Sequence, residues 1–511
     1  MQDIKQREEK MQEKRKNTPW REFVKEICSW QPLVLYRHKS WIGRYPNNNR
    51  TKQIVNRKIA DENRDNLINK WILFNNSLPF FDNLQSLFNS TEIANIIRIS
   101  DCENADFADV VVSVKNVYLS FNVTLNSENV FYSLAIRKNS KNIYNSVMVR
   151  DESENIYLGL GIIQSFNIFY SKYIYNSSNI RFSSNMQWCH DCVFCSNLEN
   201  QSYCIENKVF SKEEYLLKKE KILMQKNNFF QRYLKLTNQW NNFWSQNTNG
   251  NYILLSQDVS FWKFCYKVKN WHNIILVGWT DGDENMVDMF MWWFPSAKNF
   301  YWVIWAWWWE NIYNSTMVSF SSNIYYSYSL DSCSYCLWCI WLKNKSFCIL
   351  NKQYTKEERY ELANKIFEKM DQDWSLWKFF PPSMNPFYFN DTVAYLIDDT
   401  FTKEEVTKEG YLWREEKIAV DIPKNLEIIY TGKKDENDEK GKKGKVLSDF
   451  QWFDTNWNRQ IDPEILKKVI VDEQGNYYTI QKLELEFLQK YGLPLPEIHW
   501  LDRIKLGFRF K

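Results

Sequence analysis

Eight cysteines in two sets are the residues of this sequence best suited to chemistry. Each set has the spacing Cys-x2-Cys-x2-Cys-x8-Cys, and the two sets are Cys189, Cys192, Cys195 and Cys204, and Cys333, Cys336, Cys339 and Cys348. Four thiolates form a complete tetrahedral ligand set, so one structural Zn²⁺ per set is one interpretation. The first three cysteines of each set also resemble part of an iron–sulfur ligand pattern, although the fourth is remote and no Cys-Pro follows.

Packed free thiols are the third interpretation of the same cysteines. The chain begins with MQDIKQREEKMQEKRK, which is charged and lacks the apolar core of a signal peptide. We therefore expect a cytoplasmic protein, in which disulfides are rare and a buried cysteine behaves as a small apolar residue. Residues three apart on a straight strand face opposite ways, so a metal site requires these cysteines to lie at a turn.

An internal repeat relates the two cysteine sets. The segment CHDCVFCSNLENQSYCIENKVFSKEEY, which starts at Cys189, recurs 144 residues later as CSYCLWCIWLKNKSFCILNKQYTKEERY. In this register the cysteines of the two sets coincide, and Asn207 falls on Asn351. The chain therefore contains two copies of one module.

A shorter period runs through both modules, because an asparagine followed by an apolar residue recurs every 12 or 13 residues in the first module and at similar intervals in the second. The asparagines are Asn104, Asn116, Asn129, Asn142, Asn155, Asn167 and Asn179, and then Asn273, Asn285, Asn299, Asn311 and Asn323. The pattern predicts that Cys192 and Cys336 occupy the next asparagine positions. The apolar column then consists of Ala105, Val117, Val130, Ile143, Ile156, Ile168, Ile180 and Val193, and of Ile274, Met286, Phe300, Ile312, Ile324 and Leu337.

A period of 12 or 13 residues is typical of one coil of a narrow β-solenoid, with two short strands and two turns per coil. Stacked coils bury the apolar column in the bore and place the asparagine at a turn, where its amide can bond the amide one coil away. Capping-box patterns at Ser211–Glu214 and Thr355–Glu358 predict a helix that covers the open strand edge after each solenoid. We predict a mainly β fold with two narrow β-solenoid modules, each followed by a capping helix, and a small α+β tail.

Six segments follow from these patterns. We expect an N-terminal mixed region (1–99), a first β-solenoid module with its terminal helix (100–247), a second such module (248–373), a connecting region (374–431), a charged linker (432–445) and a tail (446–511). The linker reads GKKDENDEKGKKGK over its full length, which is a mixed-charge composition typical of disorder.

The composition excludes several classes of protein. With 44% hydrophobic and 25% charged residues, the chain is not wholly disordered. A net charge of only +3 gives no global basic field for nucleic acid or a membrane surface, although nucleic acid is not excluded. No run of about 18 apolar residues occurs, so we expect no membrane association.

Glycine is scarce and tryptophan is abundant in this sequence. There are 13 glycines, whereas average usage of about 7% gives roughly 36, and there are 25 tryptophans. The two types together make up an ordinary glycine fraction. We therefore hypothesise that many of these tryptophans are glycines encoded by UGA in a recoded genome, the alternative being a genuinely tryptophan-rich surface.

Several stretches resemble a family of uncharacterised asparagine- and cysteine-rich repeat proteins from candidate-phyla bacteria, some of which read UGA as glycine. The resembling stretches are CSWQPLVLY, CLWCIWLKNKSFCILNKQYTKEE, WSLWKFFPPSMNPFYFNDTVA, TKEEVTKEGYLW and LELEFLQKYGLPLPEIHWLDR. The resemblance implies glycine at the positions of Trp30, Trp338, Trp341, Trp374 and Trp377, and a genuine tryptophan at Trp413. Relatives carry zinc-ribbon-like cysteine pairs near the last stretch. This chain has no cysteine after Cys348, so the resemblance implies that residues 446–511 are a degenerate zinc ribbon.

These observations favour a non-catalytic scaffold or interaction protein built on a repeat solenoid, with structural Zn²⁺ in the cysteine sets as an open possibility. We expect no catalytic residues, although an enzyme of unknown class stays open. The alternative function is a zinc-dependent nucleic-acid-associated protein, by analogy to the ribbon-bearing relatives. Against it, the basic residues are dispersed along the sequence rather than gathered in a stripe. A protein partner is possible, and the sequence does not identify it.

Overall fold

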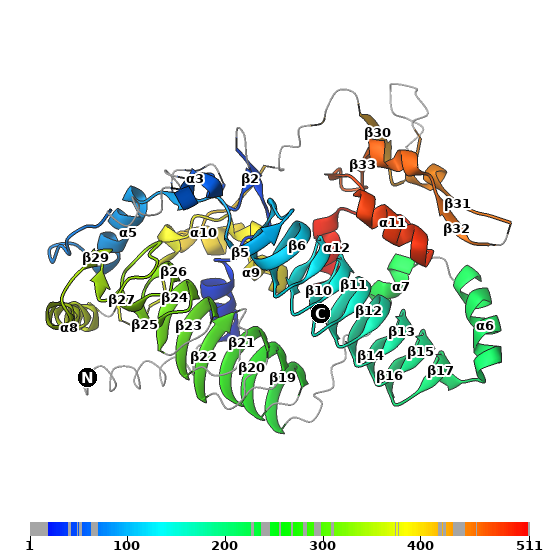
Figure 1. Ribbon diagram of the computed structural model, residues 1–511, viewed down its shortest axis with the longest axis horizontal. Coiled ribbons are helices and arrows are strands. Elements are labelled where there is room, and N and C mark those ends of the chain that lie inside the picture. Colours follow the sequence, from blue (N-terminus) through cyan, green and yellow to red (C-terminus); the bar gives the residue numbers. More distant parts are fainter. Residues whose placement is uncertain are drawn as a thin grey trace. The chain divides into compact units, whose positions relative to one another are not determined.

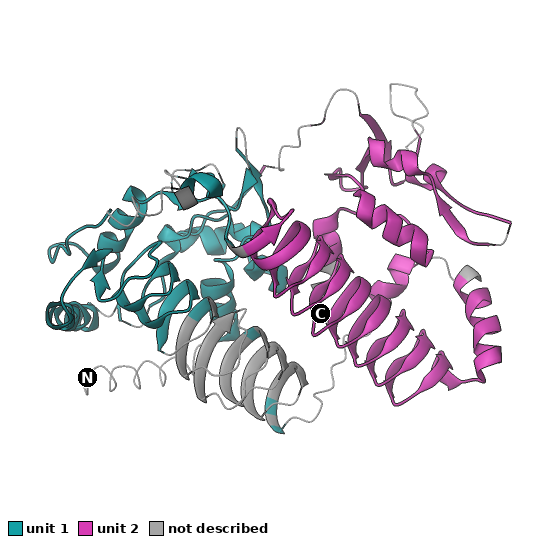
Figure 2. Cartoon of the chain, in the orientation of Figure 1, with its two compact units in different colours: residues 1–98, 240–415 teal, residues 99–239, 416–511 magenta. Residues whose placement is uncertain are grey.

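A computed structural model describes residues 19–38, 42–46, 48, 50, 54–62, 70–225, 229–236, 246–254, 257–266, 269–278, 284–290, 298–307, 311–373, 375–376, 378–416, 422, 426–432, 445–455 and 457–508. The chain forms two compact units, and each unit combines segments that are far apart in the sequence (Figure 2). Unit 1 consists of residues 1–98 and 240–415, and unit 2 consists of residues 99–239 and 416–511.

Each unit is built on a β-solenoid whose successive coils pair mostly as parallel strands (Figure 1). The strands of the unit 2 solenoid are β5 (Arg98–Glu103), β6 (Phe107–Thr124), β7 (Glu128–Phe131), β8 (Leu134–Ile136), β9 (Lys141–Tyr144), β10 (Val147–Arg150), β11 (Glu154–Ile163), β12 (Phe166–Tyr175), β13 (Ser178–Arg181), β14 (Ser184–Gln187), β15 (His190–Val193), β16 (Ser196–Glu199), β17 (Ser202–Ile205) and β18 (Lys208–Val209). Those of the unit 1 solenoid are β19 (Gln246–Leu254), β20 (Gln257–Tyr266), β21 (Lys269–Gly278), β22 (Glu284–Phe290), β23 (Lys298–Trp307), β24 (Ile312–Ser319), β25 (Ser322–Tyr325), β26 (Tyr328–Asp331), β27 (Ser334–Leu337), β28 (Cys348–Ile349) and β29 (Lys352–Gln353). The predicted fold class is confirmed.

In the 12-residue coils of unit 2 the backbone turns through a left-handed residue at every third position, and the 13-residue coils have two such residues in succession, as at Leu125 and Asn126. In the coil that contains β13 and β14, Asn176, Asn179, Phe182 and Asn185 have φ between 42° and 57°. Two strands per coil are present as predicted, but the coil has four corners rather than two because a left-handed residue also lies inside each strand. Since the corner recurs every three residues, the residue that directly follows each corner points into the bore.

Buried apolar residues fill two columns of the bore in unit 2. One column consists of Val117, Val130, Ile143, Ile156, Ile168, Ile180, Cys192 and Cys204, each paired with the next. The other consists of Val123, Ile136, Val149, Ile162, Ile174, Met186 and Leu198. Apart from the half-buried Leu198, the members of both columns belong to one buried core cluster.

Serine hydroxyls connect the coils along the two remaining columns of the bore. Ser146 Oγ donates to the carbonyl of Tyr144 at 2.7 Å and accepts from the backbone N–H of Gly159, one coil further, at 3.0 Å. Ser165 and Ser177 repeat this arrangement on the opposite column, with 3.1 Å between the N–H of Ser177 and Ser165 Oγ. Each buried hydroxyl therefore satisfies backbone groups at a corner that the strand ladder leaves unpaired.

The predicted asparagine ladder is present on the outside of the coils. Amide-to-amide hydrogen bonds of 2.9–3.1 Å run along Asn104, Asn116, Asn129, Asn142, Asn155, Asn167 and Asn179. The ladder continues to Asp191, whose Oδ1 accepts from Asn179 at 3.1 Å. In unit 1, Asn311 and Asn323 make the same bond at 3.1 Å.

The predicted positions of the last apolar residues were wrong by one residue. Ile180 pairs with Cys192 rather than with Val193, and Ile324 pairs with Cys336 rather than with Leu337. Cys192 and Cys336 therefore continue the apolar column, and Asp191 takes the asparagine position. In the second module Trp271, not Ile274, pairs with Met286. The interval shortens from 13 to 12 residues after Asn155, so extrapolating the longer interval shifts the register and moves each side chain to the other side of the wall.

Both solenoids end in the same way, with an asparagine, a short hairpin and a helix. The side chain of Asn207 bonds the backbone N–H and C=O of Ser196 at 2.8 and 3.0 Å, and Asn351 bonds Ile340 likewise. The last strand folds back antiparallel, as β18 on β17 and as β29 on β28. The helices α6 (Lys212–Gln225) and α8 (Lys356–Gln372) follow, and the capping boxes predicted for both are present.

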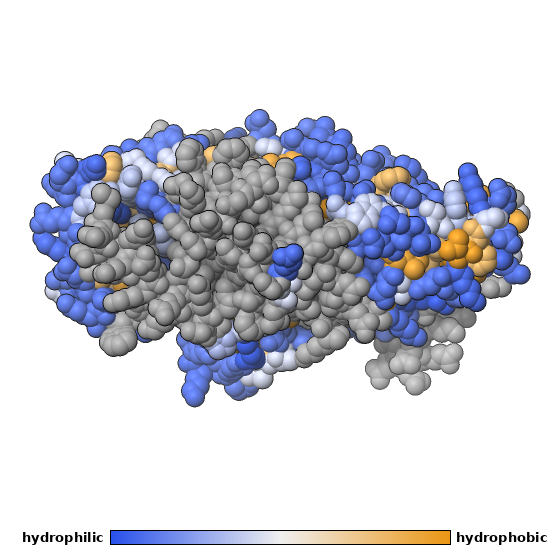
Figure 3. All heavy atoms as spheres, turned by 90° about the horizontal axis from the view of Figure 1, so that it is seen from below, coloured by the Kyte–Doolittle hydropathy of each residue, from blue (hydrophilic) through white to orange (hydrophobic). Residues whose placement is uncertain are grey.

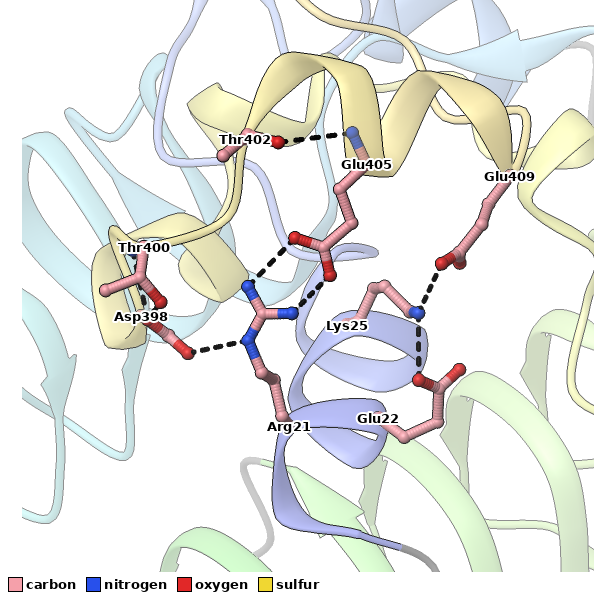
Figure 4. A network of polar contacts seen from close by, with 8 residues as sticks. All are labelled: Arg21, Glu22, Lys25, Asp398, Thr400, Thr402, Glu405 and Glu409. Carbon is pink, nitrogen blue, oxygen red and sulfur yellow. Dashed lines mark hydrogen bonds and ion pairs between the residues drawn. The ribbon is translucent and has the colours of Figure 1, made fainter.

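Non-repeat elements complete unit 1. They are α2 (Trp20–Phe23), η1 (Val24–Cys28), β1 (Tyr36–Arg37), β2 (Ile42–Gly43), β3 (Ile54–Val55), α3 (Arg57–Glu62), α5 (Phe80–Ser90), β4 (Ile93–Ala94), η2 (Pro382–Met384), η3 (Phe389–Asp391), α9 (Val393–Ile397) and α10 (Lys403–Lys408). An ion-pair network joins α2 and η1 to α10 and its flanking residues (Figure 4). Arg21 contacts Glu405 and Asp398, and Lys25 contacts Glu409 at 2.7 Å. The guanidinium of Arg21 lowers the pKa of Glu405.

The tail folds against the flank of the unit 2 solenoid, together with a helix that precedes the second module. The elements are α7 (Phe229–Lys235), β30 (Glu427–Tyr430), η4 (Leu447–Phe450), β31 (Gln451–Phe453), β32 (Arg459–Ile461), η5 (Pro463–Lys467), β33 (Lys468–Val471), β34 (Tyr477–Tyr478), α11 (Lys482–Tyr491) and α12 (Trp500–Phe508). Phe487 on α11 contacts Tyr144, with 4.5 Å between ring centroids, and Trp500 stacks on Tyr132. The predicted α+β tail is thus present, and its relation to a zinc ribbon stays a prediction.

Two of the tryptophans for which glycine is expected lie at left-handed corners. Trp338 and Trp341 have φ of 56° and 57°, are buried, and their indole N–H groups have no hydrogen-bond partner. Glycine adopts this conformation without strain. Phe194 and Asn197, the matching corners of the first module, also have φ of 57°, so the conformation fits glycine but does not require it. The recoding hypothesis stays a prediction.

The serine columns generate a stability prediction. Ser146→Val leaves the Tyr144 carbonyl and the Gly159 N–H unpaired, and each unpaired buried group costs ~1–3 kcal/mol. Ser146→Cys keeps a weak donor and acceptor, so we expect less than half of that loss. Urea unfolding followed by circular dichroism measures the difference. Ser196→Val, on the outside of the coil, is the matched control, and equal losses for the Val and Cys variants would contradict the bridging role.

Candidate functional site

The structure brings the four cysteines of the first set together in the bore, at its capped end. Cys189 directly precedes β15, Cys192 lies within that strand, Cys195 lies between β15 and β16, and Cys204 lies on β17 in the next coil. All four are buried, with at most 1% of their surface exposed. The left-handed corners at positions 188, 191 and 194 turn the first three side chains to the same side. The turn that a common site requires is therefore present between each pair of cysteines.

Two of these thiols take the place of serine hydroxyls in the bore. The N–H of Cys189 donates to Ser177 Oγ at 3.0 Å, and its Sγ lies 3.1 Å from the carbonyl oxygen of Gln187. Cys195 makes the same two contacts, with Ser183 Oγ and the carbonyl of Val193, at 3.0 and 3.3 Å. A thiol is a weak donor and a weak acceptor, so it continues the ladder at reduced strength.

The other two thiols continue the apolar column instead. Cys192 follows Ile180, and Cys204 follows Cys192. The Sγ of Cys192 also lies 3.3 Å from the carbonyl oxygen of His190. One coil thus places a cysteine from a serine column beside a cysteine from the apolar column. Four thiols therefore gather within two coils.

The second set repeats this arrangement in unit 1. Cys333, Cys336, Cys339 and Cys348 are buried, with at most 2% of their surface exposed. The N–H groups of Cys333 and Cys339 donate to Ser321 Oγ and Ser327 Oγ at 2.9 and 3.0 Å. Cys336 continues the column of Ile312 and Ile324. The two clusters therefore follow from the same position in the repeat.

Contacts among the thiols shift their proton affinities in opposite directions. Cys192 lies between Cys189 and Cys195, and its contacts with these two sulfurs raise its pKa. The contact with Cys192 lowers the pKa of Cys189 and of Cys195. The three neighbouring thiols likewise raise the pKa of Cys336. The central thiol of each cluster is therefore a hydrogen donor at neutral pH.

The sulfur atoms of the first set have both donor and acceptor contacts. Metal ligation requires thiolates. The Sγ atoms of Cys189 and Cys192 lie near backbone carbonyls, as protonated thiols do, whereas Cys195 Sγ accepts from the N–H of Asn207 at 3.4 Å. In the described part of the chain, no group of three or more His, Cys, Asp or Glu side chains has the geometry to hold a metal ion. Packed free thiols, zinc and an iron–sulfur cluster all stay predictions for these sets.

Two described cysteines, Cys28 and Cys102, lie outside the two sets. Cys28 is buried in η1 of unit 1, and burial raises its pKa, while Cys102 is half-buried in β5 of unit 2. None of the ten cysteines whose side chains the structure describes forms a disulfide. The side chain of Cys265 lies outside the described residues.

Comparisons with known proteins do not place the chain in a family. No protein-family model, no curated protein and no solved structure matches it. Within the described residues, none of the helices is both long and apolar enough to span a bilayer. The function is therefore argued from the geometry of the chain itself.

Sequence reasoning found the cysteine sets but missed two features of their surroundings. It placed Cys192 and Cys336 on the asparagine ladder, although the serines at intervals of 12 residues before Cys189 and Cys195 already mark the bore columns. It also gave no role to the aromatic residues that follow each apolar residue, among them Tyr144, Tyr157 and Phe169. Their regular recurrence was the available signal for a contact surface on the flank.

Replacement of the central thiols distinguishes the interpretations. We expect Cys192→Val and Cys336→Ile to leave the melting temperature unchanged or slightly higher, because both residue types already occupy this column in neighbouring coils. A zinc-bound cluster would instead lose about one metal ion per variant site and melt earlier. Elemental analysis and thermal melting of the anaerobically purified full chain provide both readouts, and Cys102→Val is the control outside the clusters.

Proposed function

We propose that this chain is a non-catalytic scaffold whose solenoid flanks are docking platforms for other polypeptide segments. One observation carries the proposal: both solenoids hold non-repeat elements on the same column of their repeat. This column consists of the corner residues that lie two positions after the bore residues of the first apolar column, such as Phe182 after Ile180. Both modules therefore hold other segments on the same surface of their repeat.

In unit 2 the column docks the helix α7. Phe182 and Tyr170 contact Phe229, with ring centroids 4.9 and 5.7 Å apart. The guanidinium of Arg232 lies 5.0 Å above the ring of Phe194, one coil further. Aromatic rings at corners present large apolar faces outward at little cost in side-chain entropy, which suits them to binding a helix.

The adjacent column of the same flank docks α11. Phe487 contacts Tyr144, Tyr157 and Phe169, which lie on three successive coils, with centroid distances of 4.5, 6.3 and 6.1 Å. The hydroxyl of Tyr144 also donates to the carbonyl of Leu483 at 3.2 Å. A segment more than 300 residues away in the chain thus contacts several coils of the solenoid at once.

In unit 1 the equivalent column docks α5. Tyr326 lies 144 residues after Phe182, and its ring centroid is 5.3 Å from that of Phe80 on α5. The Tyr326 hydroxyl donates to the carbonyl of Leu376, which belongs to the segment after α8. The recurrence of this contact at the same repeat position supports a platform that belongs to the solenoid rather than to one of its neighbours.

Apolar surface remains at the capped end of the unit 2 solenoid. Val209, Leu216 and Leu217 are 63%, 50% and 77% exposed. In the view of Figure 3, an apolar area lies on the side where β15–β17 and α6 lie in Figure 1, while most of the other described atoms on that face belong to hydrophilic residues. Such surface is compatible with interaction with another protein.

The outer charges of the solenoids argue for protein rather than nucleic acid as the partner. Lysines on the outside of the coils lie beside carboxylates one coil away, as in the pairs Lys115–Glu103 and Lys141–Glu128, at 3.2 and 3.9 Å. Lys343 and Asp331 repeat the pattern in unit 1. A stripe of unneutralised cations, which phosphate binding requires, is therefore not formed at these coils.

A salt titration tests the alternative, a zinc-dependent nucleic-acid-associated protein. We expect no shift of duplex DNA or single-stranded RNA by the full chain in a native gel at 50 mM salt, because the coil lysines are paired. Binding that weakens steeply between about 50 and 200 mM salt would overturn the scaffold proposal in favour of phosphate recognition. Addition of zinc to a parallel sample covers the metal-dependent form of this alternative.

Removal of one docking ring tests the platform itself. Phe487→Ala deletes the contact with three coils, so we expect a loss of ~3–5 kcal/mol in the stability of the docked tail and faster amide exchange over α11 and α12. Hydrogen exchange followed by mass spectrometry measures this, with unchanged protection expected in β19–β29. Glu486→Ala, at the neighbouring exposed position, is the control, and unchanged exchange in Phe487→Ala would contradict the docking role.

A further inference from the structure

The aromatic corner column of unit 2 is interrupted at two successive coils. Tyr132 precedes the interruption, and Tyr170, Phe182 and Phe194 follow it. Asn145 and Leu158 stand at the two intervening corners, and neither fills the volume of an aromatic ring. The flank is therefore hollow at this point, below the docked tail.

A cavity of about 340 Å³ occupies this part of unit 2. It lies between β11 and β12 of the solenoid, the helix α7, the loop 494–498 and the helix α12. Leu158, Phe229, Leu495 and Ile498 contribute apolar walls. Such a volume matches a small organic molecule with a ring system, and it exceeds the space that one or two waters need.

Polar groups without partners lie in the wall of this cavity. Arg503 is 1% exposed and donates through Nη1 to Glu484 at 3.2 Å, but its Nε and Nη2 have no hydrogen-bond acceptor. The hydroxyl of the fully buried Tyr157 lies beside Arg503 and Asn145, and neither of them meets it in full hydrogen-bond geometry. The side chains of Arg503 and Tyr157 both line the cavity. Buried polar groups are almost always paired, so these point to a molecule that pairs them.

The free atoms of Arg503 define the complementary group. Nε and Nη2 are neighbouring donors on one edge of the guanidinium, and this edge matches the two oxygens of a carboxylate. The Tyr157 hydroxyl adds a third donor. A second cation, Arg459, lies 5.6 Å from the ring of Phe229 at the wall of the cavity, and its Nε is also without an acceptor.

Two carboxylates offset part of this positive charge. Glu484 pairs with Arg503 at 3.2 Å, and burial raises the pKa of Glu484. Glu497 lies at the cavity and is exposed to solvent, where water screens its charge. The deep end of the cavity therefore offers unpaired donors beside the Arg503–Glu484 pair, and the remaining wall is apolar.

We propose that this cavity is a binding site for a small carboxylate with an apolar ring or chain, with its carboxylate on Arg503 and Tyr157 and its apolar body between Leu158, Phe229 and Ile498. The site lies where the solenoid and its docked tail meet, so a bound molecule contacts both. The inference does not depend on the scaffold proposal, because it rests on the cavity and its unpaired donors.

Calorimetric titration of the full chain with three related probes tests the site. The probes are 1-naphthylacetate, which has both features, 1-naphthylacetamide, which lacks the charge, and acetate, which lacks the ring system. We expect 1-naphthylacetate to bind at least tenfold more tightly than either of the others. Absence of binding at millimolar concentration would show that the cavity holds water only, and equal binding of the amide would overturn the carboxylate assignment.

Four variants locate the binding. Ile498→Trp fills the cavity from a half-buried position and should abolish binding of 1-naphthylacetate, while Leu217→Trp, on the exposed surface of α6, is the matched control and should bind as the parent does. Tyr157→Phe removes an unpaired hydroxyl, so binding should weaken several-fold without a lower melting temperature. Arg503→Lys should weaken binding at least tenfold, because it keeps the charge and loses the paired donors. Unchanged binding in Ile498→Trp would place the probe elsewhere and overturn the proposal, even if Arg503→Lys fails to fold.

Discussion

The left-handed corner at every third residue is the constraint on which the rest of this structure depends. Most of these corners are not glycine, and each costs roughly 1–2 kcal/mol relative to an ordinary backbone conformation. The coil tolerates this because each corner is held from both sides. The strand ladder pairs the sides of the coil, and the serines in the bore pair backbone groups at the corners that the ladder leaves open. The asparagine amides add a third line of bonds outside.

The same geometry explains why the cysteines gather. A corner every three residues turns positions 189, 192 and 195 into the bore, where a straight strand would send them to alternating faces. The bore has places for a hydroxyl and places for an aliphatic side chain, and a thiol is an imperfect substitute for either. Cys189 stands in a serine column and Cys192 in an isoleucine column, so both substitutions meet at one level of the solenoid.

The side chains on the outer surface of the coils determine which segments pack against the solenoid. Aromatic residues at several of the corners form an apolar flank, and segments from distant parts of the chain cover it in both units. Where the flank is interrupted at Asn145 and Leu158, Arg503 of the docked tail lies buried beside a cavity with two of its N–H groups unpaired. A repeat therefore supplies a uniform platform, and departures from the repeat supply the specific features on it.

The sequence by itself determined the solenoid, the coil length, the asparagine ladder and the capping helices, because all of these are local and periodic. Asn104 to Asn179 recur at the coil length, and a bond between identical amides needs only that spacing. The boxes at Ser211 and Thr355 are complete within four residues. Only the tertiary structure decided the register at Cys192, because the interval changes by one residue along the chain and a shift of one residue reverses a side chain. It also decided which segments cover the flanks and that Arg503 meets Tyr157, since contacts over more than 300 residues leave no periodic trace in the sequence.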